Sequence, residues 1–244
     1  MQSSFSENRI KRHLKTAEIT PAVFKTLPST NLYLTENAEN TPFNLVVAQK
    51  QTCGRGRRGK SFSSPKKTGI YMSLLIKNKA NDLTVAAAVA VTSAIEKITG
   101  VKTGIKWVND IYLGDKKVAG ILCETHNDKN GEPFIVLGIG VNLYSPKGGF
   151  DDEIKNIAGA LLPRRKRGLK ERLIAEIVNE LFIALENKNL ISEYRKKLIH
   201  LGKKIYVKDR PAVSIDVLEN GNLLIINDKG EEEILSSGEI SIKL

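Results

Sequence analysis

The stretch "GRGRRGKS", Gly54–Ser61, contains two glycine patterns that are typical of nucleotide-binding proteins. Its glycines at 54, 56 and 59 form G-x-G-x-x-G, and the whole octet forms G-x-x-x-x-G-K-S. Both patterns bind phosphate only where a strand precedes the glycines and a helix begins directly after them, because the helix then points backbone N–H groups at the anion. The flanking residues therefore decide whether either motif is present.

The residues before the octet fit this context, and the residues after it do not. "FNLVVAQ", residues 43–49, is a short apolar run that predicts a strand. "KSFSSPKKTG", residues 60–69, combines three serines with Pro65 and Gly69, which predicts a loop rather than a helix. The best candidate for a magnesium-binding strand, "FIVLGIGVN", ends in glycines and Asn142 instead of aspartate. We expect neither a P-loop nor a dinucleotide fold.

Three arginines within four residues, Arg55, Arg57 and Arg58, indicate a different kind of loop. Glycine makes the backbone free and costly to order, and like charges repel one another when no anion is near. Such a loop is expected to be mobile when empty and to order around a polyanion, since each charge-assisted arginine contact contributes roughly 1.5–3 kcal/mol. A solvated basic loop and a nucleic-acid contact remain alternatives from this loop alone.

The composition indicates an ordinary globular protein. The chain has 244 residues, of which 41% are hydrophobic and 27% charged, enough for one substantial domain and a small second one. No run reaches the roughly 18 apolar residues of a membrane span, and the N-terminus lacks the apolar core of a secretory signal. The two cysteines, Cys53 and Cys123, are no disulfide framework; we expect reduced thiols, packed in or near the core, in a cytoplasmic protein.

The net charge of +11 suits ATP, nucleic acid or an acidic protein partner, and does not choose among them. Residues 40–81 contain nine Lys or Arg and no acid, so part of the excess surrounds the arginine octet. A second run, "RRKRG" at Arg164–Gly168, is interpreted as a solvated loop before a helix, with a nuclear-localisation or nucleic-acid patch as the alternative.

Periodicity predicts the main elements of the chain. Helices are expected over residues 82–100, 169–187 and 191–202, the last ended by Gly202. Residues 111–124 predict two strands joined at the Gly114-Asp115 turn, and residues 133–144 a further strand whose glycines indicate close backbone approach. After Gly202, short strands at about ten-residue intervals predict a small all-β barrel or sandwich that packs on the main domain.

Three short motifs are ambiguous when each is taken singly. "STN", residues 29–31, is interpreted first as a helix N-cap, although its side chains could also hold a polar ligand. "KWVND", residues 106–110, precedes the hairpin that carries Lys117, and ordinary surface ion pairs would explain these charges, with Trp107 in the core. "GIGVN" ends in Asn142 and could be a tight strand crossing.

Taken together, the motifs are specific. In order, the chain contains "STN", "QTCGRGRRGK", "KWVND", "KVAGILCE", "GIGVN" and a terminal β module with "GEISI". This series resembles the biotin protein ligases, also called biotin–[acetyl-CoA-carboxylase] ligases, from about residue 28 to the C-terminus. The resemblance implies an α+β fold: a mixed-sheet catalytic domain of the class II aminoacyl-tRNA synthetase type, then a small SH3-like β-barrel. It divides the chain into an N-terminal extension at 1–27, a catalytic domain at 28–202 and the barrel at 203–244.

The resemblance also implies the functional residues. Biotin would be bound by Ser29, Thr30, Asn31, Gln51, Arg55, Gly56, Arg57 and Lys117. ATP and the adenylate would be bound by Arg55, Arg57, Lys106, Asn109, Lys117 and Asn142. The implied catalytic set is Lys117, Arg55, Arg57 and Asp110, with Asn109 and Asp110 orienting Lys117 or a cation. No metal site is expected from the protein itself, and Mg²⁺ would enter with ATP.

The implied reaction has two steps. Biotin attacks the α-phosphate of ATP to give biotinoyl-5′-AMP and pyrophosphate, and a lysine of a biotin carboxyl carrier protein then attacks the mixed anhydride. Neither step needs a protein nucleophile, since positioned Arg and Lys stabilise the migrating charge. The arginine octet would act as a lid that orders over the anhydride and excludes water. A homodimer is possible, and no membrane partner is expected.

The chain departs from the family pattern in two places. Val108 replaces the usual proline of "KWPND", which puts local rigidity in doubt. Residues 1–27 are too few for the winged helix-turn-helix of some bacterial members, so we expect a monofunctional ligase without specific DNA binding. Two other functions stay open: a lipoate-type protein ligase, expected to lack the arginine loop, and a basic nucleic-acid-binding module with steep salt dependence and no ATP turnover.

Overall fold

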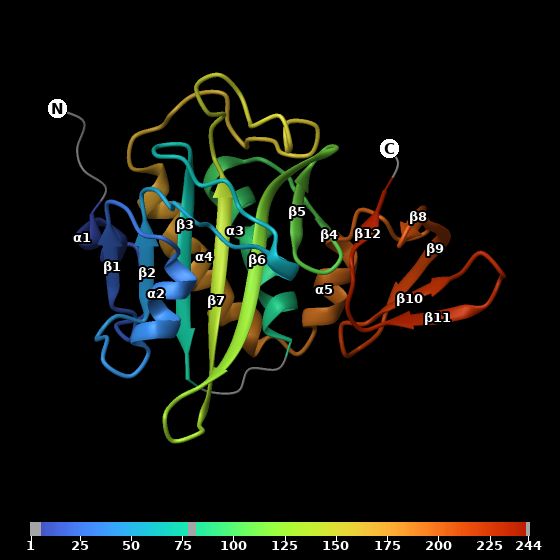
Figure 1. Ribbon diagram of the computed structural model, residues 1–244, viewed down its shortest axis with the longest axis horizontal. Helices are drawn as coiled ribbons and strands as arrows, with labels where there is room; N and C mark the ends of the chain where they lie inside the picture. Colours follow the sequence, from blue (N-terminus) through green and yellow to red (C-terminus); the bar gives the residue numbers. More distant parts are fainter. Residues whose placement is uncertain (1–5, 78–81, 243–244) are drawn as a thin grey trace.

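The computed structural model describes residues 6–77 and 82–242, which form two neighbouring sheets (Figure 1). The larger sheet has seven strands and the smaller, C-terminal sheet has five. The expected α+β fold, with a mixed main sheet followed by a small β module, is therefore confirmed. The ends of the predicted N-terminal extension and terminal module, residues 1–5 and 243–244, lie outside the described residues, and the domain limits themselves stay predictions.

The main sheet is mixed because its first two strands run parallel and all its other neighbours are antiparallel. The hairpin predicted over residues 111–124 is present, with its turn at Gly114-Asp115, and so are the strands predicted within 43–49 and 133–144. In spatial order the sheet consists of β1 (Pro21–Phe24), β2 (Leu45–Ala48), β3 (Gly69–Ile76), β7 (Pro133–Asn142), β6 (Lys116–Asn127), β5 (Asp110–Leu113) and β4 (Gly104–Lys106).

Helices cover both faces of the main sheet. In Figure 1, α2 (Thr30–Asn37) lies on one face, and α3 (Leu83–Thr99) and α4 (Leu169–Glu186) lie on the other. The residues of β2 alternate between the two resulting cores: Leu45 and Val47 belong to the larger one, and Val46 and Ala48 to the smaller one beneath α2. A strand covered on both faces is apolar throughout, which explains the continuous run "LVVA".

Two of the three predicted helices have the expected limits, and the third is shorter. α3 ends before Gly100, whose φ of +76° suits a residue without a Cβ, and α4 begins directly after the exposed run Arg164–Arg167. The prediction that the last helix continues to Gly202 is wrong, since α5 (Leu190–Lys197) ends five residues earlier. Leu198 pairs with Ile105 of β4 instead, and the N–H of Ile199 donates to the carbonyl of Ile105 over 3.0 Å.

The C-terminal module packs against the main sheet through a shared core. Its five strands are antiparallel, and the indole Nε1 of the buried Trp107 donates to the carbonyl of Gly221 over 3.0 Å. Trp107 is thus a core residue, as predicted. The strands are β8 (Lys204–Val207), β9 (Arg210–Val217), β10 (Leu223–Ile226), β11 (Glu232–Leu235) and β12 (Ile240–Ser241).

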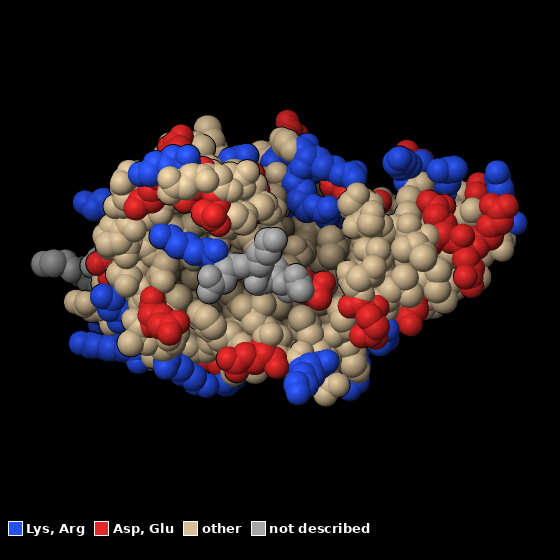
Figure 2. Space-filling model, turned by 90° about the horizontal axis from the view of Figure 1, so that it is seen from below, with Lys and Arg blue, Asp and Glu red and all other residues tan. Residues whose placement is uncertain are grey.

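The positive charge of the protein resides in its main part. Residues 203–244 contain six Lys or Arg and eight Asp or Glu, so the C-terminal module is slightly acidic although the whole chain carries +11. Acidic side chains gather on the face of this module seen in Figure 2, whereas Lys and Arg are spread over the main part. Any anion attracted by the net charge is therefore drawn to residues 1–202.

Two further expectations concern the cysteines and the membrane. Cys123 is half-buried, and burial raises the pKa of its thiol to about 11. The expectation of a packed thiol is wrong for Cys53, which is exposed because it precedes the arginine octet at the surface. Within residues 6–77 and 82–242, every helix is too short or too polar to span a bilayer.

Candidate active site

A cavity of about 380 Å³ opens where the main sheet, the octet Gly54–Ser61 and the C-terminal module meet. We call this octet the arginine loop. The remaining walls come from residues 150–158 and residues 238–241. All twelve residues predicted for the site line this one cavity: Ser29, Thr30, Asn31, Gln51, Arg55, Gly56, Arg57, Lys106, Asn109, Asp110, Lys117 and Asn142. The structure therefore brings together motifs that are more than a hundred residues apart in the chain.

The N-terminus of α2 forms a polar floor at one end of the cavity. Ser29 caps the helix, its Oγ accepting the N–H of Leu32 over 3.4 Å, so the N-cap interpretation of this serine is confirmed. Thr30 donates both its N–H and its hydroxyl to Oε1 of Gln51, at 2.8 and 3.1 Å. Capping thus explains only Ser29 of the three "STN" residues. Thr30 and Asn31 are buried, do not cap the helix and line the cavity.

Glycines of β7 make room for the floor and for an aromatic side chain. A Cβ on Gly138 would collide with the side-chain amide of Asn31, and a Cβ on Gly140 would lie 2.5 Å from the ring of Phe62. The close backbone approach predicted for these two glycines is confirmed. Phe62 follows the arginine loop directly, and its ring lies against the backbone of β7 at Gly140.

The arginine loop has neither of the two nucleotide folds that its sequence suggests. Its ends approach each other through a bridge between Arg55 and Ser61, and a single 3₁₀ turn, Arg57–Gly59, lies between them. The chain then continues as an irregular segment into β3 instead of entering a helix. The glycines therefore form a folded flap beside the cavity, without the helix N-terminus that a P-loop or dinucleotide motif requires.

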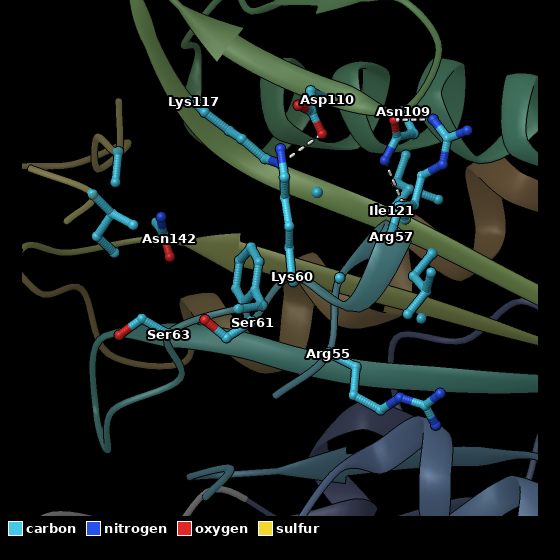
Figure 3. Close-up of a pocket in the computed structure, with 18 of the residues that line it drawn as sticks. Arg55, Arg57, Lys60, Ser61, Ser63, Asn109, Asp110, Lys117, Ile121 and Asn142 are labelled. Atoms are coloured by element: carbon cyan, nitrogen blue, oxygen red, sulfur yellow. Dashed lines mark hydrogen bonds and ion pairs between the residues drawn. The ribbon is translucent and has the colours of Figure 1, made fainter. Parts of the chain in front are cut away.

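The arginines of the loop point to different sides of the cavity (Figure 3). Nη1 of Arg57 donates to Oδ1 of Asn109 over 3.0 Å and to the carbonyl of Gly238 over 3.4 Å. Arg55 is directed away from this group, and its Nη2 lies 2.8 Å from Oε1 of Glu124. Arg57 thus ties the loop to both the main sheet and the C-terminal module, while Arg55 ties it to β6.

Lys117 and Asp110 form an ion pair at the centre of the cavity. Nζ of Lys117 lies 2.6 Å from Oδ1 of Asp110, and both side chains are largely shielded from solvent (Figure 3). A β-bulge between Ile111 and Tyr112 shifts the β5–β6 register next to Lys117. The backbone N–H of Lys117 donates to the carbonyl of Ile157, and its carbonyl accepts from the N–H of Gly159. These two bonds, the bulge and the ion pair together hold Lys117 in place.

Lys106 and Asn142 also line the wall of the cavity. Nζ of Lys106 lies 3.2 Å from the hydroxyl of Tyr112 and 5.1 Å from the centre of its ring. Burial, followed by the negative charge of Asp110, raises the pKa of Tyr112, so this phenol is neutral and can act as a donor or an acceptor. Asn142 ends β7 on the side of the cavity away from Asn109 and Arg57 (Figure 3).

Residues 23–142 match the model of the Biotin/lipoate A/B protein ligase family, and these residues contain every segment of the floor, the arginine loop and the Lys117–Asp110 pair. This part of the chain is similar to the members of that family. The match ends at Asn142, the last of the predicted site residues, so it includes all of them, whereas the cavity walls at residues 150–158 and 238–241 lie outside it.

The curated relatives of this chain carry biotin ligase names. It is 42% identical over 122 residues to the bifunctional ligase/repressor BirA of Bacillus subtilis, a match covering 48% of this chain and 38% of the relative. It is 27% identical over 214 residues to the biotin--[acetyl-CoA-carboxylase] ligase of Mycobacterium tuberculosis, covering 80% of this chain and 77% of that protein. The chain thus spans well under half of the Bacillus relatives it matches.

Solved structures extend the similarity to nearly the whole chain. The biotin protein ligase of Aquifex aeolicus, in complex with biotin and ATP, has a TM-score of 0.74 and 27% identity, and covers 91% of this chain and 98% of its own. The biotin acetyl coenzyme A carboxylase synthetase of Helicobacter pylori has a TM-score of 0.60 at 24% identity, with 88% and 98% coverage, which supports the fold.

Only some of the cations that line the cavity have a carboxylate partner. Lys117 is paired with Asp110 and Arg55 with Glu124, so each of these cations has a carboxylate partner. The contacts of Arg57 are the amide oxygen of Asn109 and a backbone carbonyl, which are neutral acceptors. Arg57 therefore brings a positive charge that its hydrogen-bond partners do not cancel, in the position where an anionic ligand would meet the loop.

Sequence reasoning did not assign roles to several residues that the structure places in this site. Phe62 and Ser73 had no signal in the chain, since an isolated aromatic or serine has many uses. Glu124 is the last residue of the motif "KVAGILCE" and Glu239 lies within "GEISI", yet neither received a role. Nζ of Lys60 lies 2.6 Å from Oε2 of Glu239, and this ion pair lowers the pKa of the Glu239 carboxyl. The pair joins the arginine loop to the C-terminal module.

The carboxylates of the site do not form a metal centre. In the part of the chain that the structure describes, no three His, Cys, Asp or Glu side chains gather as potential metal ligands. Asp110, the carboxylate at the centre of the cavity, is engaged by Lys117.

Proposed function

We propose that this protein is a biotin protein ligase, which activates biotin with ATP and transfers it to a lysine of a biotin carboxyl carrier protein. The observation that carries the proposal is the single cavity that joins a neutral polar floor to a row of cations. Biotin has a matching polarity, with a neutral ureido group at one end and a carboxylate at the other. The Aquifex aeolicus ligase with the same fold contains biotin and ATP, which supports this reading.

The floor accepts the ureido end of biotin. Ser29, Thr30, Asn31 and Gln51 offer both donors and acceptors, which a group with two N–H and one C=O requires. The floor has no net charge, so it discriminates by hydrogen-bond geometry. A substrate lacking these groups would leave buried polar atoms unpaired, which costs about 1–3 kcal/mol for each atom.

The cations act where charge develops. The biotin carboxylate oxygen attacks the α-phosphorus of ATP, the bond from that phosphorus to the bridging oxygen breaks, and pyrophosphate leaves. Arg57 is placed to bind phosphoryl oxygens because its present partners are neutral, and Lys117 is held toward the reacting groups by Asp110. Lys106, beside Tyr112, would bind the departing pyrophosphate, and Asn142 would contact the adenosine part of ATP. Mg²⁺ enters with the phosphates of ATP.

The second step needs access for one lysine and exclusion of water. The ε-amine of the carrier lysine attacks the carbonyl of biotinoyl-5′-AMP, the carbon–oxygen bond to the phosphate breaks, and an amide forms as AMP leaves and the amine loses its proton. The folded arginine loop and Phe62 cover the floor and limit hydrolysis of the mixed anhydride. The finer predictions, namely a monofunctional enzyme without specific DNA binding, a possible homodimer and a cytoplasmic location, stay predictions.

Pyrophosphate–ATP exchange that depends on added biotin tests the first step. The purified chain is incubated with ATP, Mg²⁺ and labelled pyrophosphate, with biotin, with lipoate or with neither. We expect exchange with biotin alone and background in the other two mixtures. Background in all three would overturn the proposal, and exchange with lipoate in place of biotin would reassign the chain to the lipoate branch of its family. Mass spectrometry of a carrier domain then tests the transfer step.

A further inference from the structure

Glu124 on β6 uses both oxygens of its carboxylate to join two separate parts of the site. Its Oε1 accepts from Nη2 of Arg55 over 2.8 Å, and its Oε2 accepts from Nδ2 of Asn31 over 2.8 Å. Arg55 belongs to the arginine loop and Asn31 to the floor. The Glu124 side chain is 18% exposed and that of Arg55 43%, so the pair is shielded mainly on the glutamate side.

The contact with Asn31 continues across the floor. Oδ1 of Asn31 lies 2.5 Å from Oγ of Ser73, which lies 2.7 Å from the hydroxyl of Thr30. Thr30 donates in turn to Oε1 of Gln51. Because Glu124 can only accept, it fixes which way the Asn31 amide is turned: the NH₂ faces Glu124 and the oxygen faces Ser73.

From Gln51 the hydrogen bonds return to the segment that follows the arginine loop. Nε2 of Gln51 donates to Oγ of Ser64 over 2.8 Å, and that hydroxyl donates to the carbonyl of Phe62 over 2.9 Å. The N–H of Phe62 donates to the carbonyl of Gly54 over 2.9 Å. The polar groups therefore form a closed ring that leaves the loop at Arg55, crosses the floor and re-enters the chain at Phe62.

We propose that Glu124 is a positioning residue, the latch that holds the arginine loop closed over the floor. This inference rests on the proposed function, because the latch retains the biotinoyl adenylate. Glu124 itself touches neither end of the reacting bond: Lys117 and Asp110 lie elsewhere on the wall, and Arg55 points away from them (Figure 3). Its effect is carried by Arg55 and by the orientation of Asn31.

The latch works through charge and geometry together. Arg55, Arg57 and Arg58 repel one another, which opens the loop unless an anion compensates them. Glu124 supplies that anion permanently at the first arginine, so the loop closes on one side before any substrate is bound. Without Glu124, Arg55 would lose its carboxylate partner and only the ligand would hold this end of the loop. The adenylate would then dissociate faster.

The test compares Glu124→Ala with the matched control Glu132→Ala, an exposed glutamate in the turn between β6 and β7. Each variant, and the wild-type protein, is loaded with labelled biotin and ATP in the presence of pyrophosphatase and no carrier. Release of biotinoyl-5′-AMP is measured in this mixture, where the released adenylate is trapped as the hydroxamate with hydroxylamine. Biotin-dependent pyrophosphate exchange is measured in a separate mixture without pyrophosphatase, because that enzyme would hydrolyse the labelled pyrophosphate. We expect Glu124→Ala to keep exchange within about fivefold of wild type and to release the adenylate at least tenfold faster, whereas Glu132→Ala matches wild type in both.

The pair Arg55–Glu124 is tested by the double variant. If Glu124 acts through Arg55, release from Arg55→Ala/Glu124→Ala is no faster than from Arg55→Ala alone. The latch proposal is overturned if Glu124→Ala releases the adenylate at the wild-type rate. It is also overturned if the effects of the two single substitutions on the release rate add in full in the double variant. Folding of each variant is checked by its thermal unfolding midpoint. If wild type itself shows no biotin-dependent exchange, the proposed function fails instead, so the two failures are distinguishable.

Discussion

Nζ of Lys117 lies 2.6 Å from Oδ1 of Asp110, across a register shift between two neighbouring strands. The pair holds the lysine at a fixed place in the cavity wall, since its backbone is also bound by Ile157 and Gly159. A cation with so little freedom can stabilise developing charge without reorganising during the reaction.

Replacement of Lys117 by alanine is therefore expected to lower biotin-dependent exchange by roughly a hundredfold or more, the usual effect of removing one positioned donor to developing charge. The control is Arg165→Ala, in the exposed run before α4, which should stay within about twofold of wild type. Initial exchange rates at saturating biotin and ATP are compared between the two variants and wild type. Equal losses in the two variants would mean that the site has been misplaced.

Arg57 and Arg58 are neighbours in the arginine loop with different surroundings. Arg57 lines the cavity and contacts Asn109, whereas Arg58 is exposed and does not line it. We expect Arg57→Ala to weaken ATP use by about 1.5–3 kcal/mol, or roughly ten- to hundredfold in kcat/KM, because a charge-assisted contact to phosphate is lost. Arg58→Ala should change kcat/KM for ATP by less than about threefold. Comparable losses would show that loop charge in general, rather than Arg57 in particular, binds the nucleotide.

Gly138 lies against the amide of Asn31, and an added methyl group has no room there. Gly138→Ala is expected to cost about 1–3 kcal/mol of binding, because Asn31 must move out of the floor. Since this floor is assigned to biotin, the KM for biotin should rise by roughly 5- to 150-fold while the KM for ATP stays nearly constant. A parallel rise of both constants would argue that the floor does not select biotin.

His200 predicts a pH dependence of stability. Its Nε2 accepts the N–H of Trp107 over 3.1 Å, and burial, with Lys106 and Lys203 nearby, lowers the pKa of His200 to about 4. The unfolded state binds a proton near pH 6.5 and the folded state does not, so stability is full above pH 6.5 and falls as the pH drops toward 4. The expected loss approaches about 3 kcal/mol over this window.

Urea unfolding at several pH values checks this expectation. His200→Gln cannot titrate, and its unfolding free energy should vary much less between pH 7 and pH 4.5 than that of wild type. His13→Gln, at an exposed position, is the control and should keep the wild-type slope. If His200→Gln also keeps that slope, another group causes the acid lability.

The local sequence determined much of this protein. Apolar runs bounded by turn residues gave the positions of β2, β7, the hairpin of β5 and β6, and the five C-terminal strands, because burial and turn chemistry act over short distances. The order and spacing of the motifs indicated the family that residues 23–142 match, and twelve of the residues that line the cavity. The rejection of a phosphate-binding helix after the glycines also needed only the serines and Pro65 that follow them.

The tertiary structure decided which of these residues meet. Arg55 pairs with a glutamate 69 positions away, and Arg57 reaches a carbonyl 181 positions away. α5 ends early because Leu198 pairs with β4, and Cys53 is exposed because the arginine loop lies at the surface. Such contacts depend on the order of strands in the sheet and on the placement of the C-terminal module. A local pattern of polarity contains no information about either. It determines which face of a helix or strand is buried, but not which other element packs against that face.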